Sequence, residues 1–226
     1  LNFMLDLTLA LTVGVPLAIL IYIVRSDRFP EPSGMVLKTF FIGVAIIIPA
    51  GFLNSFIVVM ENSSGYDLSF LAGFTEEPLK FLAFMLFVFS KTDFDEPMDA
   101  IVYGTVISLG FATYENIEYV YLMYGDQSFQ IAILRAISAI PLHASCGVIM
   151  GYYIGLYAFK GKKMELLKAL VIPVFIHALY NFLAGYSGEL IFFGYLICVI
   201  YFANKLHKEF VYEQQLKTSE TETKLR

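Results

Sequence analysis

The stretch SFLAGFTEEPLKFLAFMLFVFS, residues 69–90, decides which fold this sequence predicts. It has about the 20 residues that an α-helix needs to cross roughly 30 Å of hydrocarbon. Glu76, Glu77 and Lys80 nevertheless lie inside this otherwise apolar stretch. Because an ionised side chain at the centre of a membrane helix costs roughly 2.5 to 3.5 kcal/mol, these residues are expected to face the polar interior of a helix bundle.

The composition of the whole chain shows that this stretch is one of several. Of the 226 residues, 58% are hydrophobic and only 15% are charged, with a mean hydropathy of +0.70. Soluble domains usually hold about 45 to 50% apolar residues. The sequence therefore predicts an all-α, polytopic transmembrane bundle. Seven spans are expected, at residues 3–24, 35–60, 69–90, 99–124, 128–159, 168–185 and 189–206.

Little of the chain lies outside these spans, so a separate soluble domain of about 50 residues has no room. Residues 1–206 are expected to form a single transmembrane domain. Residues 207–226 are rich in charge and are expected to form a cytoplasmic tail that is partly disordered.

The basic residues outside the spans predict the orientation of the chain. The turns after the first, third and fifth spans and the end of the chain carry Lys or Arg, whereas the turns after the second, fourth and sixth spans carry none. Since Lys and Arg are retained on the cytoplasmic side, the N-terminus is expected outside and the C-terminus in the cytoplasm.

The charged residues of the opening stretch predict one local ion pair. Glu76 and Lys80 are one helical turn apart and can pair. Glu77 points about 100° away from Glu76 and is expected to lack a local partner. The unpaired carboxylate indicates a ligand or a proton rather than a purely structural ion pair.

Later spans supply further polar side chains. Glu115 lies in GFATYENIEYV (110–120), His143 in PLHASCG (141–147), and His177 and Asn181 one turn apart in FIHALYNF (175–182). Counted along the helices, Glu76 lies roughly 10 Å and Glu115 roughly 12 Å below the outer boundary, with both histidines near mid-membrane. Helix tilt can close the difference. Because bundles assemble metal and acid–base sites from such side chains, one site in the outer half of the membrane is expected.

Prolines accompany three of these polar positions. Pro78 follows the two acids, Pro141 precedes His143, and Pro173 precedes His177 by one turn. Each proline removes a backbone hydrogen bond and is expected to kink its helix. Such breaks are tolerated in a membrane where the backbone borders protein or a water-filled cavity.

These motifs resemble those of the PrsW family of bacterial intramembrane proteases. EEPLK has the form EExxK, GFATYEN resembles a Gly-Phe-Ala-x-x-Glu-Asn motif, and the two histidines follow in separate helices, over roughly residues 70–185. The chain is more distantly similar to the CAAX prenyl endopeptidases and their bacterial relatives. Lys80 is one residue nearer to the acids than the arginine of those relatives, and Glu115 stands where they have a histidine.

The resemblance implies a multi-pass protein of the bacterial cell membrane that cleaves a membrane-anchored protein. In this family the reaction is typically site-1 cleavage of an anti-sigma factor in a stress response. The partners would then be the protein substrate and the lipid bilayer. A nucleic-acid partner is not expected, because the sequence has no basic, aromatic groove and no phosphate-binding glycine loop.

Peptide hydrolysis needs a nucleophilic water, a group that polarises the carbonyl and an acid for the leaving amine. A zinc ion bound by His143, His177 and a carboxylate would supply the first two. The carboxylate is either Glu115 or one of the pair Glu76 and Glu77. This hypothesis makes the protein a zinc metalloprotease.

The remaining acid of the Glu76 and Glu77 pair is then expected to act as the general base. Lys80 is expected to hold one carboxylate ionised, and Asn181 to polarise the carbonyl or to orient His177. A metal-free alternative stays open, in which a glutamate activates water and the histidines and Asn181 stabilise the oxyanion.

Other protease motifs and other classes of membrane protein explain the sequence less well. GYSG, residues 185–188, matches a rhomboid serine-protease motif, but the only later histidine, His207, is expected roughly 30 Å away at the opposite membrane face. The HExxH zinc-protease motif is absent from the sequence. A proton-coupled transporter or a small-molecule receptor remains an alternative, with Arg135 as a counter-ion, although the two halves show no inverted repeat.

Overall fold

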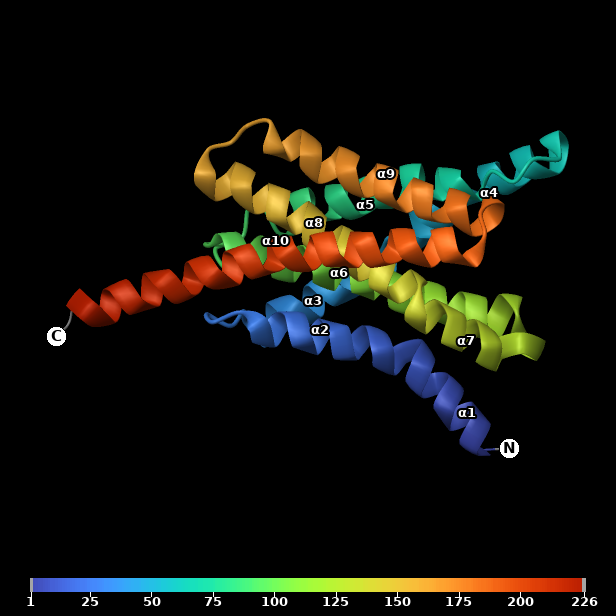
Figure 1. The fold of residues 1–226 in the computed structure, drawn as a ribbon, viewed down its shortest axis with the longest axis horizontal. Coiled ribbons are helices and arrows are strands. Elements are labelled where there is room, and N and C mark those ends of the chain that lie inside the picture. Colours follow the sequence, from blue (N-terminus) through green and yellow to red (C-terminus); the bar gives the residue numbers. More distant parts are fainter. Residues whose placement is uncertain (1, 225–226) are drawn as a thin grey trace.

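The computed structural model describes residues 2–224 and is a bundle of helices (Figure 1). Every regular element in this range is helical, which confirms the all-α class. The main helices are α1 (Asn2–Leu9), α2 (Val15–Ser26), α3 (Ser33–Ala45), α4 (Ile47–Ser64), α5 (Ala72–Phe87), α6 (Pro97–Ile117), α7 (Ser128–Ile137), α8 (Ala139–Lys160), α9 (Glu165–Tyr186) and α10 (Glu189–Lys224). Shorter π- and 3₁₀-helical pieces join them: η1 (Ala10–Gly14), η2 (Ser69–Leu71), η3 (Glu118–Met123) and η4 (Gly125–Gln127).

Several of these helices are long and apolar enough to cross a membrane. Five candidate spans meet both criteria: Phe3–Ser26, Ser33–Ser64, Gly125–Lys160, Glu165–Tyr186 and Glu189–Ser219. The other two predicted spans are also helical, but α5 is only 16 residues long and carries three charges. Helix α6 is long enough, with 21 residues, but it is not among the helices that are also apolar enough. The count of seven spans and the orientation of the termini therefore remain predictions.

Some of the candidate spans are broken near the polar positions. The span Ser33–Ser64 divides into α3 and α4 at Ile46, and the helix holding His143 begins anew after Ser138, three residues before Pro141. Pro78 and Pro173 lie inside α5 and α9.

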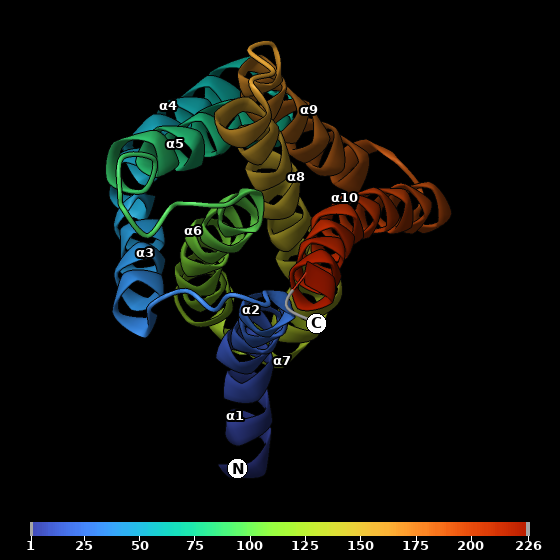
Figure 2. The same ribbon diagram turned by 90° about the vertical axis from the view of Figure 1, so that its left-hand side faces the viewer.

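Helices α6 and α8 form the centre of the bundle, with the other helices arranged around them (Figure 2). Their contact depends on glycine. A Cβ atom at Gly104 would lie 2.8 Å from the carbonyl oxygen of Gly147, and one at Gly147 would lie 2.7 Å from the Cα of Thr105. Only glycine permits this approach, which brings the side chains of α6 and α8 within reach of one another.

The beginning of α6 is fixed by a reciprocal capping box. The side chain of Glu96 accepts from the backbone of Asp99, and the side chain of Asp99 accepts from the backbone N–H of Glu96 at 2.7 Å. Pro97 occupies the first turn, where its missing N–H has no helical partner to lose. The start of the central helix is therefore set by local chemistry.

The charged end of the chain differs from the expectation. Helix α10 continues through residues 207–224, where a partly disordered tail was predicted, and it extends beyond the rest of the bundle (Figure 1). Its inner face is held by side-chain contacts: Glu209 accepts from the Tyr152 hydroxyl at 2.8 Å, and the Gln214 amide donates to Asp27 at 2.8 Å. These contacts hold the first part of the polar segment, as far as Gln214, against the bundle. The cytoplasmic location of this segment stays a prediction.

Candidate active site

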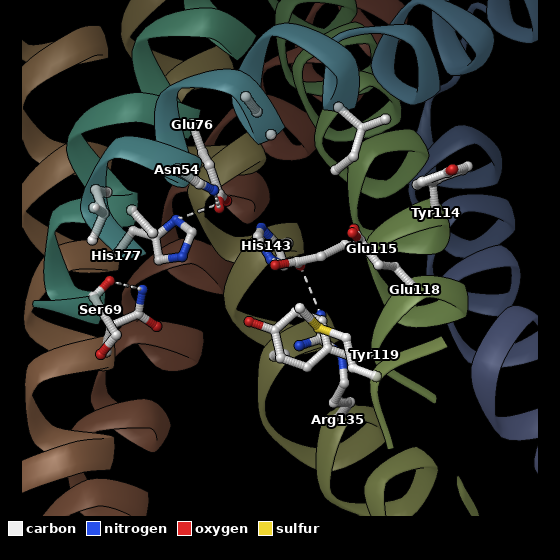
Figure 3. A pocket seen from close by; sticks show the side chains of 18 of the residues that line it. Asn54, Ser69, Glu76, Tyr114, Glu115, Glu118, Tyr119, Arg135, His143 and His177 are labelled. Atoms are coloured by element: carbon white, nitrogen blue, oxygen red, sulfur yellow. Dashed lines mark hydrogen bonds and ion pairs between the residues drawn. The ribbon is translucent and has the colours of Figure 1, made fainter. Parts of the chain in front are cut away.

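Four helices bring the predicted polar residues to one place inside the bundle (Figure 3). Helix α5 supplies Glu76, Glu77 and Lys80, and α8 and α9 supply His143 and His177. All five side chains are buried. Glu115 of α6, which is also among the predicted residues, is partly exposed to a cavity of about 750 Å³. A cluster of charged groups this far from bulk water requires each charge to be matched within the protein.

Lys80 is the centre of this charge network. Its Nζ lies 2.7 Å from Glu77 Oε1, 3.0 Å from His143 Nδ1 and 3.8 Å from Glu76 Oε2. The ammonium also lies 4.3 Å from the ring centre of Phe111, a cation–π contact. The expectation that Glu77 has no local partner is wrong, because positions three residues apart also share a helix face.

Glu77 also reaches the sixth predicted span. His177 Nδ1 lies 2.9 Å from Glu77 Oε1, so the ring donates this proton to the carboxylate. That hydrogen bond sets the tautomer and leaves Nε2 with its lone pair. The ring of His177 stands at 90° to that of His143, with centroids 5.0 Å apart. A carboxylate that holds the far nitrogen of a histidine is the usual support of a metal-binding imidazole.

Glu76 points into the cavity beside the two histidines. Its Oε1 accepts from the Asn54 amide at 3.2 Å, and Asn54 in turn accepts from the Thr75 hydroxyl at 2.6 Å. Its Oε2 is buried and has no hydrogen bond among the described residues, and the Lys80 ammonium lies 3.8 Å from it, beyond hydrogen-bond distance. An orphaned buried carboxylate oxygen is costly unless a cation or a proton completes it.

Glu76, His143 and His177 form the group that fits a metal ion. One ligand atom from each lies within 4.8 Å of the ligand atoms of the other two. Two imidazoles and one carboxylate, with a further position open to water or substrate, are a donor set that suits catalytic zinc. The orphaned oxygen of Glu76 therefore fits the expected zinc, with Glu76 as the carboxylate of this group.

Glu115, the other carboxylate considered as a ligand, has a different environment. Its Oε2 accepts from Arg135 Nη2 at 2.7 Å and lies 2.9 Å from His143 Nε2. Arg135 also donates through Nε to Asn116 at 2.6 Å, and its guanidinium lies 4.3 Å from the ring centre of Tyr119. Glu115 is thus an ion-pair partner that orients His143 from the side opposite Lys80.

Asn181 lines the cavity one turn beyond His177, but it bonds to another part of the chain. Its amide donates to the backbone carbonyl of Ser69 in η2 at 3.2 Å. No sequence motif marks Asn54, whose amide donates to Glu76. The sequence suggests Arg135 only as a counter-ion in the transporter alternative and does not predict its ion pair with Glu115.

The chain is similar in sequence to a family of known proteins. A sequence model of the family described as "PrsW family intramembrane metalloprotease" matches residues 31–204. The chain belongs to the PrsW family. The matched range contains every residue of the site described above.

Relatives in the PrsW family cover most of this chain and most of their own length. Protease PrsW of Bacillus subtilis (strain 168) is 39% identical over 174 residues, which are 74% of this chain and 78% of the relative. Protease PrsW of Oceanobacillus iheyensis is 34% identical over 180 residues, 76% and 80% of the two chains. Protease PrsW of Clostridioides difficile (strain 630) is 32% identical over 188 residues, 78% and 79% of the two chains. No solved structure matches the chain significantly.

Membership of the PrsW family confirms the resemblance found in the sequence. The protein is an intramembrane protease with multiple apolar helices, and it acts within a lipid bilayer. The transporter and receptor alternatives are set aside on this ground.

Proposed function

We propose that this protein is a zinc-dependent endopeptidase that cleaves a membrane-anchored protein in the outer half of the membrane. The observation that carries the proposal is the group Glu76, His143 and His177 on the wall of a cavity between helices. Its orphaned Glu76 oxygen lies beside two histidines, each held by a hydrogen bond to a carboxylate.

Glu76, His143 and His177 would hold the zinc ion. When bound there, zinc would supply Lewis-acid chemistry, polarising the peptide carbonyl and easing the loss of a proton from water. Glu77 positions His177 by accepting its Nδ1 proton. Lys80 balances the charge of Glu77, and its ammonium also contacts Nδ1 of His143.

Glu115 is the carboxylate that we assign as proton acceptor. It lines the cavity, and Arg135 and His143 both engage its Oε2. Among the described residues no hydrogen bond reaches Oε1, which remains able to accept a proton from the attacking water and return it to the leaving amine. Asn181, which also lines the cavity, is assigned to contact the substrate backbone.

A metal-free mechanism is favoured by one observation. Both ring nitrogens of His143 have partners, Lys80 at Nδ1 and Glu115 at Nε2. In this second candidate Glu76 activates the water through its orphaned oxygen, and His143, His177 and Asn181 stabilise the oxyanion. The two mechanisms share the cavity and differ in whether zinc is needed.

The cavity also fits a membrane-anchored substrate. It lies between α4 and the η3–α7 segment, and its wall is largely apolar, with Ile57, Val58, Ile131 and Leu134 among the lining residues. The outer face of α4 exposes Phe52 and Phe56, as a lipid-facing helix does. We infer that an apolar substrate segment enters beside α4. By likeness to PrsW proteases, the substrate is an anti-sigma factor cut at its first site.

The position of the cut tests this proposal. Purified protein reconstituted in liposomes with a single-pass anti-sigma factor is expected to cut the substrate at one position, roughly 10 to 12 Å below the outer surface, because Glu76 and Glu115 lie at that predicted depth. Mass spectrometry of the two fragments locates the cut. The variant Glu76→Gln serves as the inactive control. A cut in the cytoplasmic half, or in a soluble domain, would contradict the proposal.

A further inference from the structure

A second cluster of acidic side chains lies at the other end of the bundle from the cavity. The loop after α2 supplies Asp27 and Glu31, and the first turn of α6 supplies Asp99. The loop and the beginning of α6 meet at the end toward which the last turns of α10 extend (Figures 1 and 2). Asp99 and Glu115 lie near opposite ends of α6, roughly 24 Å apart at about 1.5 Å per residue. This cluster is therefore separate from the candidate active site.

The three carboxylates face one another. One oxygen from each of Asp27, Glu31 and Asp99 lies within 4.8 Å of the oxygens of the other two. Like charges at this separation repel strongly where water is excluded. A cluster of this kind needs a cation or protons to be stable.

The hydrogen bonds described for these carboxylates come from neutral groups. Asp27 Oδ1 accepts from the Phe29 N–H at 2.9 Å and from the Gln214 amide at 2.8 Å. Asp99 Oδ2 accepts from the N–H groups of Asp95 and Glu96 at 2.8 and 2.7 Å. Glu31 Oε2 accepts from the Tyr103 hydroxyl. These bonds fix the orientation of each carboxylate but use only part of its capacity.

Two oxygens of the cluster accept no hydrogen bond from an N–H or hydroxyl group of the described residues. Asp27 Oδ2 and Asp99 Oδ1 are buried and make no hydrogen bond among the described residues. The side chains themselves are 5% and 0% exposed. Buried carboxylate oxygens are normally hydrogen-bonded or coordinate a cation. These orphaned oxygens, each on a residue that contributes a ligand atom to the cluster, indicate a missing positive partner.

We propose that Asp27, Glu31 and Asp99 bind a divalent cation that prefers oxygen ligands, Mg²⁺ or Ca²⁺. The donor set contains only carboxylates, which suits these hard cations better than zinc. Ligand atoms within 4.8 Å of one another are close enough to share Ca²⁺, whose opposite oxygens lie about 4.6 to 5.2 Å apart, whereas Mg²⁺ needs them within about 4.0 to 4.2 Å. The cation would join the α2–α3 loop to the start of α6.

The site would also reach α10 through Gln214, whose amide donates to both Asp27 and Glu96. Binding of the cation would therefore stabilise the packing of α10 against α6 and the α2–α3 loop. This role is structural and does not depend on the zinc proposed for the active site.

Thermal unfolding with and without the cation tests this inference. Protein purified in detergent and freed of metal by EDTA would be melted by circular dichroism in buffer alone, with MgCl₂, and with CaCl₂. At a cation concentration about 100-fold above Kd, we expect at least one cation to raise Tm by about 5 °C or more. Titration calorimetry of the same sample should show one equivalent bound. Comparing the MgCl₂ and CaCl₂ arms identifies the cation.

Four variants separate this site from other carboxylates. Glu31→Gln and Asp27→Asn should each weaken binding at least about ten-fold and abolish the Tm shift. Neither residue takes part in the capping box of α6, so both variants should fold. Glu209→Gln is the matched control, because it also removes a carboxylate bonded to a tyrosine hydroxyl, that of Tyr152. Glu209→Gln and His177→Ala should retain the shift.

The outcomes are decisive in both directions. Loss of the shift in Glu31→Gln and Asp27→Asn, with retention in Glu209→Gln and His177→Ala, supports the site. If neither Mg²⁺ nor Ca²⁺ binds the wild-type protein, protons neutralise the cluster and the inference is wrong. Retention of the shift in both cluster variants would overturn it as well.

Discussion

Replacing Glu76 by glutamine should lower cleavage of a membrane-anchored substrate by about 10³-fold, equivalent to about 4 kcal/mol of transition-state stabilisation. The change keeps the size of the side chain and the hydrogen bond from Asn54, but it removes the negative charge beside His143 and His177. Co-expression with a single-pass substrate, followed by immunoblotting of the fragments, measures the effect.

Glu77→Gln should have a smaller effect, about 10- to 100-fold, because Glu77 acts on the reaction through the orientation of His177. The matched control is Glu165→Gln. Glu165 forms the same kind of pair with a lysine three residues later, Lys168, at the start of α9, where the lysine is 50% exposed. Cleavage at the wild-type rate by both Glu76→Gln and Glu77→Gln would remove these carboxylates from the mechanism.

Arg135→Ala should destabilise the protein by about 3 to 5 kcal/mol, because it leaves the carboxylate of Glu115 largely buried without its cation. The side chains of Arg135 and Glu115 are only 11% and 13% exposed. Unfolding of the purified protein in detergent by denaturant, followed by circular dichroism, measures the change.

Two further variants test whether the stability lost in Arg135→Ala comes from the unpaired charge of Glu115. The double variant Arg135→Ala with Glu115→Gln should be less destabilised than Arg135→Ala alone, since it removes the uncompensated charge. Lys160→Ala breaks a pair of similar length with Glu213 whose members are 33% and 35% exposed, and it should cost less than about 1 kcal/mol. Equal stability of Arg135→Ala and Lys160→Ala would show that the Arg135 pair is not a buried one.

The class of the fold follows from hydrophobicity and helix length, which act locally along the chain. The sequence therefore predicts α9 and the apolar part of α10 well. It does not predict the break at Ile46 or the shift of α8 after Ser138, because these depend on packing against neighbouring helices. The helical continuation of α10 was also missed, since contacts such as that between Tyr152 and Glu209 join distant parts of the chain.

Part of the site could be predicted from the sequence, because a charged side chain inside a membrane is costly and therefore indicates a polar site. That rule alone selects Glu76, Glu77 and Lys80, and counting residues along helices brings Glu115, His143 and His177 to nearby depths. Counting residues along the helices does not predict which of these side chains form ion pairs or hydrogen bonds with one another. Lys80 pairs with Glu76 and Glu77 on its own helix, but its contact with His143 joins α5 to α8. Glu115 of α6 pairs with Arg135 of α7, and the sequence does not predict which way α7 is rotated.

The acidic cluster at the opposite end illustrates the same limit. Asp27 and Glu31 in one turn and Asp99 after another are ordinary turn acids in the sequence. Only the packing of the α2–α3 loop against α6 and α10 buries their oxygens together. No local pattern indicates this arrangement.

Zinc content together with activity tests the central claim most directly. Elemental analysis of the purified wild-type protein should give about one zinc per chain, and His177→Ala should give far less, because three protein ligands hold a catalytic zinc. Chelation should abolish cleavage of the reconstituted substrate, and added zinc should restore it. Full cleavage by protein shown to be free of metal would contradict the zinc mechanism and leave the glutamate mechanism in its place.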